Sequence, residues 1–135
     1  MIRSSNRRSR RLRKKLHIGE FQNWAYLTDH AIATRSLVFT FDHGRTEEFH
    51  VYIWEPHRVA EQHWRCPYLI QGDSFEGGSY CPGADSMQAL VLATHSISSY
   101  LAWLARSHNG VFTLDGSTDL GFPDFGDVEP ENMKL

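Results

Sequence analysis

Apolar residues recur at helical spacing over one long segment in the C-terminal half of the chain. Asp85 precedes the repeat and can cap a helix together with Gln88, and Asn109-Gly110 follows it as a stop signal. The spacing predicts an amphipathic helix over residues 85–107, about 33 Å long at the usual rise per residue, which would lie across a sheet. The repeating positions are Met87, Leu90, Thr94, Ile97, Leu101 and Leu104, with Val91 and Ala93 widening the apolar side.

Two shorter segments upstream alternate between opposite faces, with the period of a β-strand. The first covers residues 32–41, where Leu37 and Phe39 share one face. The second covers residues 49–54, and the turn residues Asp42-His43-Gly44-Arg45 lie between the two. The sequence therefore predicts an antiparallel hairpin. In its second strand Phe49, Val51 and Ile53 alternate with His50, Tyr52 and Trp54.

Three weaker patterns complete the predicted sheet. A strand over residues 68–71 follows Pro67, whose missing N–H indicates a strand start or an edge position. Residues 79–81 have weak strand character among glycines and a proline, and residues 111–114 are typical of a returning strand. We therefore predict an α+β fold, in which a small, mainly antiparallel sheet of about four strands packs against one long helix.

Charge is distributed very unevenly along the chain. Residues 1–18 contain eight Lys and Arg residues and no acidic residue. The whole chain has 14 Lys and Arg against 16 Asp and Glu, which leaves residues 19–135 with 6 cations, 16 acids and a net charge of −10. Such asymmetry indicates a polyanionic partner for the basic end. We expect a basic arm over residues 1–22, disordered or helical, then a single domain over residues 23–123 and an acidic flexible tail over residues 124–135.

Length and composition narrow the class of protein. A chain of 135 residues with 41% hydrophobic residues fits one domain. Two cysteines are too few for a disulfide framework, and no run resembles a secretory signal or a membrane span. A mitochondrial presequence would also be Arg-rich and acid-free, but it would be amphipathic. Because the arm has few aliphatic residues, we instead expect a cytoplasmic protein with no membrane partner.

Three side chains, His63, Cys66 and Cys81, could in principle supply zinc ligands. Structural zinc sites usually contain a close pair of the Cys-x-x-Cys or His-x3-His type, and this sequence has neither. Scattered loop and surface positions explain the eight histidines of the chain better than a metal site does. We therefore expect no bound metal.

The sequence contains no recognisable catalytic arrangement. A nucleophile elbow of the Gly-x-Ser-x-Gly type is absent, and Gly77-Gly78 is not followed by the lysine of a phosphate-binding loop. Asp85 and His95 could perform acid–base chemistry. However, Asp85 is explained as a helix cap, and His95 falls on a helix face, shared with Gln88 and Ser99, that we expect to be solvated. We therefore predict no enzymatic activity, no cofactor and no small-molecule substrate.

Four aromatic residues on the predicted strands allow two interpretations. Tyr52, Trp54, Trp64 and Tyr68 could form an exposed platform of the kind on which unpaired bases stack. Aromatic residues are also common in strands for reasons of packing alone. We favour packing in the core or at a sheet edge.

The basic arm continues into a segment that resembles a known family. Residues 6–22 read Asn-Arg-Arg-Ser-Arg-Arg-Leu-Arg-Lys-Lys-Leu-His-Ile-Gly-Glu-Phe-Gln. This order resembles the start of the YggL family, small bacterial proteins described as binding the large ribosomal subunit. The resemblance implies association with the ribosomal large subunit and its rRNA. The candidate RNA contacts that it implies are Arg7, Arg8, Arg10, Arg11, Arg13, Lys14 and Lys15.

Most of the remaining chain resembles a second family. Residues 32–123 look like a group of small bacterial domains known only as a domain of unknown function, so this resemblance implies no activity. The segments that carry it are typical of a strand, a capped helix start and a tight turn. They are Trp64-Arg-Cys-Pro-Tyr-Leu-Ile70, Gly83-Ala-Asp-Ser-Met-Gln-Ala-Leu90 and Asp119-Leu-Gly-Phe-Pro123.

Two functions are compatible with these patterns. The first is a non-enzymatic protein that associates with ribosomal RNA through its basic arm, while the acidic body supplies orientation or a second contact. The alternative is a small acidic protein-binding module of the immunity or antitoxin type, whose body covers a basic protein.

Overall fold

A computed structural model describes residues 30–123, so the predicted arm and the tail from residue 124 lie outside the described residues. The described chain contains one helix and six strands, and almost every element follows its predecessor after a short turn. The elements are β1 (Ala33–Phe41), β2 (Thr46–Ile53), β3 (His57–Ala60), β4 (His63–Gln71), β5 (Glu76–Gly83), α2 (Ser86–Ser107) and β6 (Gly110–Thr113).

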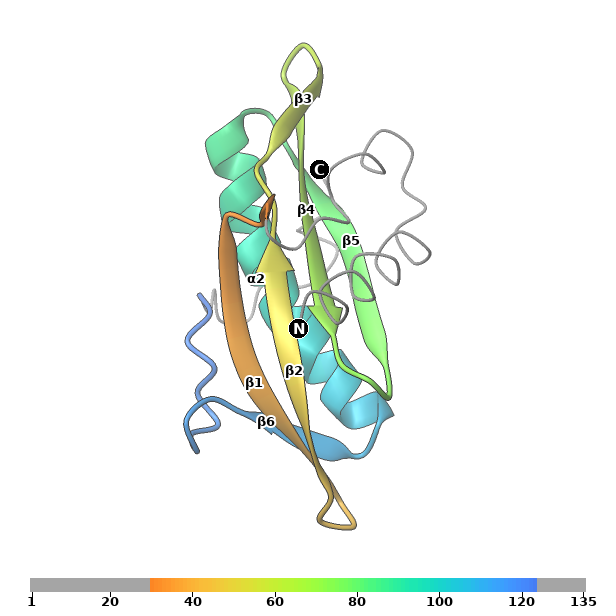
Figure 1. Cartoon of the computed structure of the whole chain (residues 1–135). Coiled ribbons are helices and arrows are strands. Elements are labelled where there is room, and N and C mark those ends of the chain that lie inside the picture. The colour runs from red at the N-terminus through yellow and green to blue at the C-terminus, as the bar shows by residue number, and fades with distance from the viewer. Residues whose placement is uncertain (1–29, 124–135) are drawn as a thin grey trace.

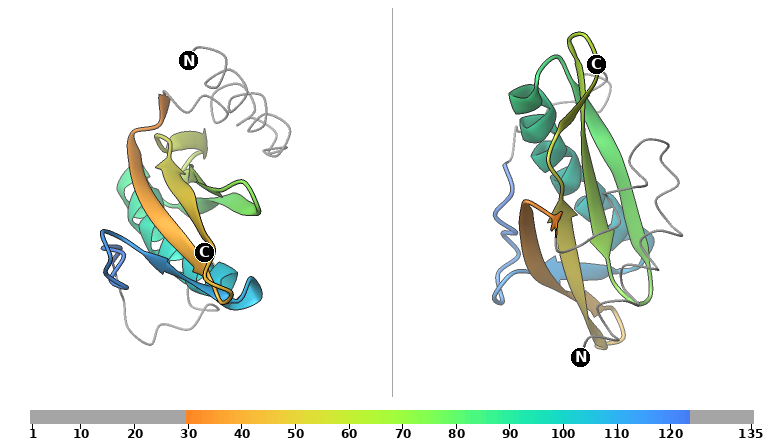
Figure 2. Two further views of the ribbon diagram at one scale, coloured as in Figure 1. Left: turned by 60° about the horizontal axis from the view of Figure 1, so that its bottom comes forward. Right: turned by 45° about the horizontal axis from the view of Figure 1, so that its top comes forward.

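The strands form one antiparallel sheet, and the helix lies across one of its faces (Figure 1). β4 is central: it pairs with β5 on one side and with both β2 and β3 on the other. Beyond β2 follow β1 and then β6. The predicted α+β class is therefore confirmed, but the described sheet has six strands, not about four. Figure 2 shows from two further directions that α2 covers one face of the sheet.

The predicted hairpin is confirmed as β1 and β2. Leu37 lies opposite Phe49, so the apolar positions of both strands share one face. The turn between them is closed by the Phe41 N–H, which donates to Arg45 O at 2.8 Å, and by the Gly44 N–H, which donates to Phe41 O at 2.9 Å. Gly44 has φ +95, a conformation that favours glycine at this place in the turn.

The prediction that a short strand starts after Pro67 is wrong. β4 begins at His63, four residues before Pro67, and Pro67 lies buried in the middle of this central strand. Pro67 O accepts a hydrogen bond from the Trp54 N–H at 3.1 Å. Because the N–H and C=O of a strand residue point to the same neighbour, the missing N–H of Pro67 faces residues 54–56, where β2 has ended and β3 has not begun. The proline therefore costs the sheet no hydrogen bond between strands.

The close approach of α2 to β5 depends on two glycines. A Cβ at Gly83 would lie 2.4 Å from the backbone nitrogen of Ala89, and one at Gly77 would lie 2.6 Å from the Tyr100 ring. Both glycines alternate along β5 with outward positions and therefore point toward the helix. The sequence predicted only a weak strand over residues 79–81 because glycines surround it. In the structure those glycines allow a strand of eight residues to pack against the helix.

The predicted ends of the helix are confirmed. Asp85 Oδ1 accepts from the Gln88 N–H at 2.7 Å, and Gln88 Oε1 accepts from the Ala84 N–H at 2.6 Å, which is the predicted variant of a capping box. At the other end, the His108 N–H donates to Leu104 O, and Asn109 takes φ +55 beyond the last turn.

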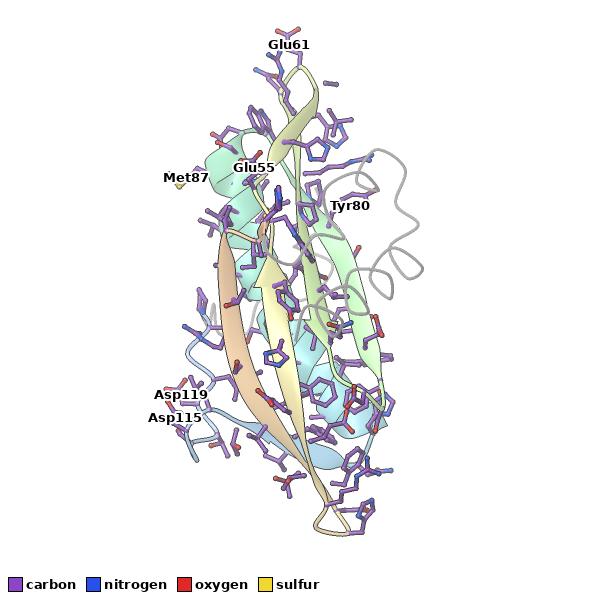
Figure 3. All side chains as sticks on the ribbon, in the orientation of Figure 1. Glu55, Glu61, Tyr80, Met87, Asp115 and Asp119 are labelled. Carbon is purple, nitrogen blue, oxygen red and sulfur yellow. The ribbon has the colours of Figure 1, made fainter. Side chains whose placement is uncertain are left out.

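The predicted apolar stripe of the helix is only partly correct. Ile97 and Leu101 face the sheet, but Met87 and Val91 are 68% and 42% exposed, and Met87 projects away from the protein in Figure 3. The contact with Gly83 holds the helical turn that contains Ala89 against the sheet. The buried stripe of the helix therefore has alanines in its first half and larger aliphatic residues in its second half. Its members are Ala89, Ala93, Ile97, Leu101 and Leu104.

Aromatic rings fill the core where the end of α2 meets the β1–β2 hairpin. The Phe39 and Phe112 centroids are 4.7 Å apart, and those of Phe49 and Phe75 are 4.5 Å apart. Phe75, from the β4–β5 loop, also stacks on the His108 ring at 3.8 Å. Edge-to-face and offset aromatic pairs add to the stabilisation that burial alone provides, so this cluster fixes the hairpin against the helix.

Candidate functional site

The candidate RNA contacts of the basic arm, Arg7 to Lys15, lie outside the described residues. Residues 30–123 contain five arginines and ten Asp and Glu residues, a net charge of −5 with histidines neutral. Four of the five arginines contact their own chain, so this part of the protein offers little free positive charge to a phosphate backbone. Arg35 donates to Leu120 O, Arg45 pairs with Glu47, Arg58 donates to Ala60 O, and Arg65 lies over the Tyr80 ring.

Arg35 fastens the last described residues to the edge of the sheet. Its Nη1 donates to both Leu120 O and Gly121 O at 3.0 Å, and its guanidinium lies 4.9 Å from the centre of the Phe122 ring. Asp119 Oδ1 accepts from the Gly121 N–H at 2.9 Å, which confirms the tight turn predicted for this segment. Among the described strands, β6 pairs only with the second half of β1. Residues 119–123, which we call the strap, lie against the first half.

A pocket of about 210 Å³ lies between the strap, β1, β2 and α2. Ligand pockets usually enclose about 300 Å³ or more and contain a few converging polar groups. Here the Arg35 guanidinium is held by backbone carbonyls, and the Thr94 hydroxyl donates to Val91 O at 2.6 Å. Because these polar groups are already engaged, the pocket is better explained as a gap beneath the strap than as a ligand site.

A second, shallow depression of about 390 Å³ lies along α2. Ser96, Ser99, Tyr100 and Trp103 line it, and Trp103 is 53% exposed. The rings of Tyr100 and Trp103 meet edge to face at 5.7 Å. A large exposed aromatic beside small hydroxyl residues is typical of a protein contact, and no sequence pattern pointed to it.

The two cysteines lie opposite each other on β4 and β5, inside the core. Burial raises the pKa of Cys66 to about 12, with a further contribution from the nearby Cys81, and burial also raises the pKa of Cys81. The Cys66 thiol donates to Trp54 O at 3.4 Å, and the sulfur of Cys81 is 3.2 Å from Ser96 Oγ. Both thiols are therefore protonated and inert near neutral pH.

His63 does not join the two cysteines. It lies three residues before Cys66 in β4, and an odd separation places two strand residues on opposite faces. Within residues 30–123, no three or more His, Cys, Asp or Glu side chains are grouped so that they could hold a metal ion.

Asp85 and His95 do not form an acid–base pair. Asp85 is occupied as the helix cap, and ten residues of helix separate the two positions by about 15 Å. The prediction that His95 is solvated is wrong, because it is only 6% exposed whereas Gln88 and Ser99 beside it on the helix are exposed.

The four strand aromatics do not form a single platform, and the prediction that they are packed is confirmed. Trp64 and Tyr68 lie on the face that carries α2. Tyr52 and Trp54 lie on the opposite face, where Trp54 is 0% exposed, and their rings stack at 5.9 Å. The sheet thus has buried side chains on both faces. We call the second patch the outer face, and its members are Tyr52, Trp54, Pro67, Leu69 and Tyr80.

Together these features define a small α+β protein with an acidic body and two buried thiols. A family model described as "Domain of unknown function (DUF6968)" matches residues 33–124, and the chain therefore belongs to this family. No curated protein and no solved structure matches the chain. No match to the YggL family was found either, so the resemblance over residues 6–22 stays a prediction. Among the described residues, no helix combines the length and the hydropathy that a membrane crossing requires.

Proposed function

We propose that the protein is a non-enzymatic RNA-associated protein that binds the large ribosomal subunit through its basic N-terminal arm. The observation that carries this proposal is the separation of charge along the chain. All eight cations of residues 1–18 stand without a single acidic neighbour, while residues 30–123 have a net charge of −5. A phosphate backbone is attracted by the first region and repelled by the second.

The contacts of the body arginines support the same assignment. Arg35, Arg45 and Arg65 each interact with their own chain, so phosphate binding through the body would first have to break those contacts. Residues 1–18 contain no acidic residue with which their cations could pair. The arm supplies affinity and a fast encounter with RNA, and the acidic body limits how closely the remainder of the protein approaches the phosphates.

The resemblance of residues 6–22 to the start of the YggL family narrows the polyanion to ribosomal RNA. This segment contains seven of the cations and continues into Leu16-His-Ile-Gly-Glu-Phe-Gln22, a mixed stretch that a simple nuclear-targeting run or a solvated tail would not need. The residues assigned to rRNA are Arg7, Arg8, Arg10, Arg11, Arg13, Lys14 and Lys15.

Sedimentation of a bacterial lysate through sucrose tests the proposal. The full chain should move with the large subunit at low salt and return to the top of the gradient at raised salt. A variant with glutamine at the seven assigned positions should stay at the top in both conditions. The matched control replaces Arg58 and Arg106, two exposed arginines of the body, with glutamine and should sediment like the parent protein.

Two outcomes would overturn the assignment. If the full chain stays at the top with ribosomes present at low salt, it does not bind them. If the glutamine variant still sediments with the large subunit, the binding surface belongs to the body and not to the arm.

A second function, the acidic protein-binding module, is favoured by the surface of α2. Met87, Val91 and Trp103 leave large apolar side chains exposed on this helix of an acidic body. Purification that recovers one basic protein at equal stoichiometry, free of RNA, would support it, provided that Met87→Ser with Val91→Ser, or Trp103→Ser, abolishes recovery. Recovery that survives both sets of substitutions would contradict it.

A further inference from the structure

The turn between α2 and β6 contains the pair Asn109-Gly110. Of the four asparagines in the chain, only Asn109 precedes a glycine. Asn109 is exposed and takes φ +55, a backbone conformation that asparagine adopts more readily than most residues. Within residues 30–123, no group forms a hydrogen bond with its side-chain amide. The pair therefore ends the helix through its backbone alone, and the amide of Asn109 is accessible to solvent.

The backbone nitrogen of Gly110 is turned away from β1. The Asp42 N–H, directly after β1, donates to Asn109 O at 2.9 Å, so the carbonyl of the Asn109–Gly110 peptide points toward that side. This peptide is trans, so its N–H points the other way. Among the described strands, β6 is the last in the order of the sheet, and none lies on the side to which this N–H points. No hydrogen bond between described strands has to break before the Gly110 nitrogen can react.

We propose that Asn109-Gly110 is a site of spontaneous covalent modification that converts Asn109 to aspartate or isoaspartate. The Gly110 nitrogen loses its proton and attacks Cγ of Asn109, which forms the N–Cγ bond of a succinimide ring. The Cγ–Nδ2 bond breaks, and the amide leaves with a proton as ammonia. Water then opens the ring. Attack of water at Cγ breaks the new N–Cγ bond and gives aspartate, whereas attack at the main-chain carbonyl carbon gives isoaspartate.

The fold requires the glycine that this reaction also favours. A Cβ at Gly110 would lie 2.3 Å from the Phe39 ring and 2.5 Å from Thr40 O. Any side chain at this position would therefore disturb the aromatic core. The same lack of a side chain leaves the Gly110 nitrogen unhindered on the side from which the Asn109 amide approaches it.

Isoaspartate would damage the junction of β6 with β1. The main chain then runs through the former side chain of Asn109, which inserts an additional methylene group before Gly110. Gly110 lies opposite Phe41 and against the Phe39 ring, so the inserted group displaces β6 either from its register or from the core. Both products also add a negative charge beside Asp42, and like charges on neighbouring strands repel each other.

Ion-exchange chromatography of the full chain, aged in mildly alkaline buffer, tests this site. Acidic species should accumulate, and faster as the pH rises, because the attacking nitrogen must lose its proton. Tandem mass spectrometry should place the exchange of amide for acid at Asn109. Asn109→Gly accepts the positive φ but has no amide, so these species should be lost. The matched control is Asp115→Glu: Asp115-Gly116 can isomerise without gaining charge, so this variant should form acidic species at the parent rate.

Ageing in guanidinium chloride separates a reactive site from a protected one. The unfolded chain gives the intrinsic rate of the Asn109-Gly110 pair, and the folded chain should form acidic species at a comparable rate. The proposal is overturned if these species appear only in the unfolded chain, or if they persist unchanged in Asn109→Gly. The purified isoaspartyl protein should also unfold at a lower urea concentration than the parent, and an equal midpoint would overturn the proposed damage to β6. None of these measurements involves RNA.

Discussion

The two faces of the sheet both carry buried aromatic side chains but are built in different ways. The inner face meets α2, which is held at its start by Asp85 and approaches β5 closely because of Gly77 and Gly83. The outer face carries Tyr52 and Trp54, whose rings stack on each other at 5.9 Å. The difference teaches that the inner face depends on a cap and two glycines that position a helix, whereas the outer face is built from aromatic side chains of the strands themselves.

The largest difference we expect concerns the reactivity of the inner-face cysteines. Burial raises the pKa of Cys66 from 9.0 to about 12. At neutral pH the reactive thiolate is then about a thousandfold rarer than in an unfolded chain. Iodoacetamide labelling followed by mass spectrometry should show the same retardation, relieved by urea. Ser107→Cys, in the exposed last turn of α2, provides a thiol that should react at once, and equal labelling of Cys66 would show that the inner face is open.

The next effect is the removal of one ring from the inner core. Phe39 is fully buried among Phe41, Phe49, Phe75 and Phe112. Phe39→Ala should lower the free energy of unfolding by about 3–5 kcal/mol, as measured in urea. Val38→Ala, at the neighbouring exposed position, should change it by less than about 0.5 kcal/mol. A small effect of Phe39→Ala would mean that the aromatic cluster does not hold the hairpin to α2.

A substitution at Trp54 sharpens the contrast at the outer face. Trp54→Ala should cost about 3 kcal/mol in the full chain. A cost below about 1 kcal/mol, measured by urea unfolding, would show that the outer face contributes much less to stability than the aromatic core of the inner face.

The smallest effect on stability is expected at the N-terminal cap of α2. Asp85→Ala removes the acceptor for the Gln88 N–H and should cost about 1 kcal/mol of unfolding free energy. Glu61→Ala, at the tip of the β3–β4 hairpin seen in Figure 3, should be neutral. An unchanged stability in Asp85→Ala would show that packing against β5, and not the cap, fixes where α2 begins.

The elements with strong local signals could be predicted from the sequence. The helix has six repeating positions and two capping signals, and the hairpin has alternation on both sides of a turn. β3 was missed because His57–Ala60 is a short, mostly exposed strand without alternation, and the first half of β4 was missed because Pro67 suggested a strand start. The missing N–H of Pro67 costs no hydrogen bond because it faces the gap between β2 and β3, and no local sequence pattern reveals that gap.

The surfaces were harder to predict than the elements. Periodicity gives a wide apolar stripe on α2, but the contact of Gly83 with Ala89 decides that Met87 and Val91 remain exposed. The bond from Arg35 to Leu120 O joins residues 85 positions apart, so neither residue carries a local signal of the other. Alternation did place Tyr52 and Trp54 on one face, but it could not show that this face is buried.

The most direct test of the proposed function is a salt titration of RNA binding. A fluorescent single-stranded rRNA fragment is bound by the full chain, and the association constant is measured by anisotropy over a range of salt. If six arm cations contact phosphates, a plot of log Kobs against log salt should have a slope of about −4. A chain lacking residues 1–18 should show no measurable binding. A slope near zero, or binding that survives this deletion with the same slope, would contradict the account.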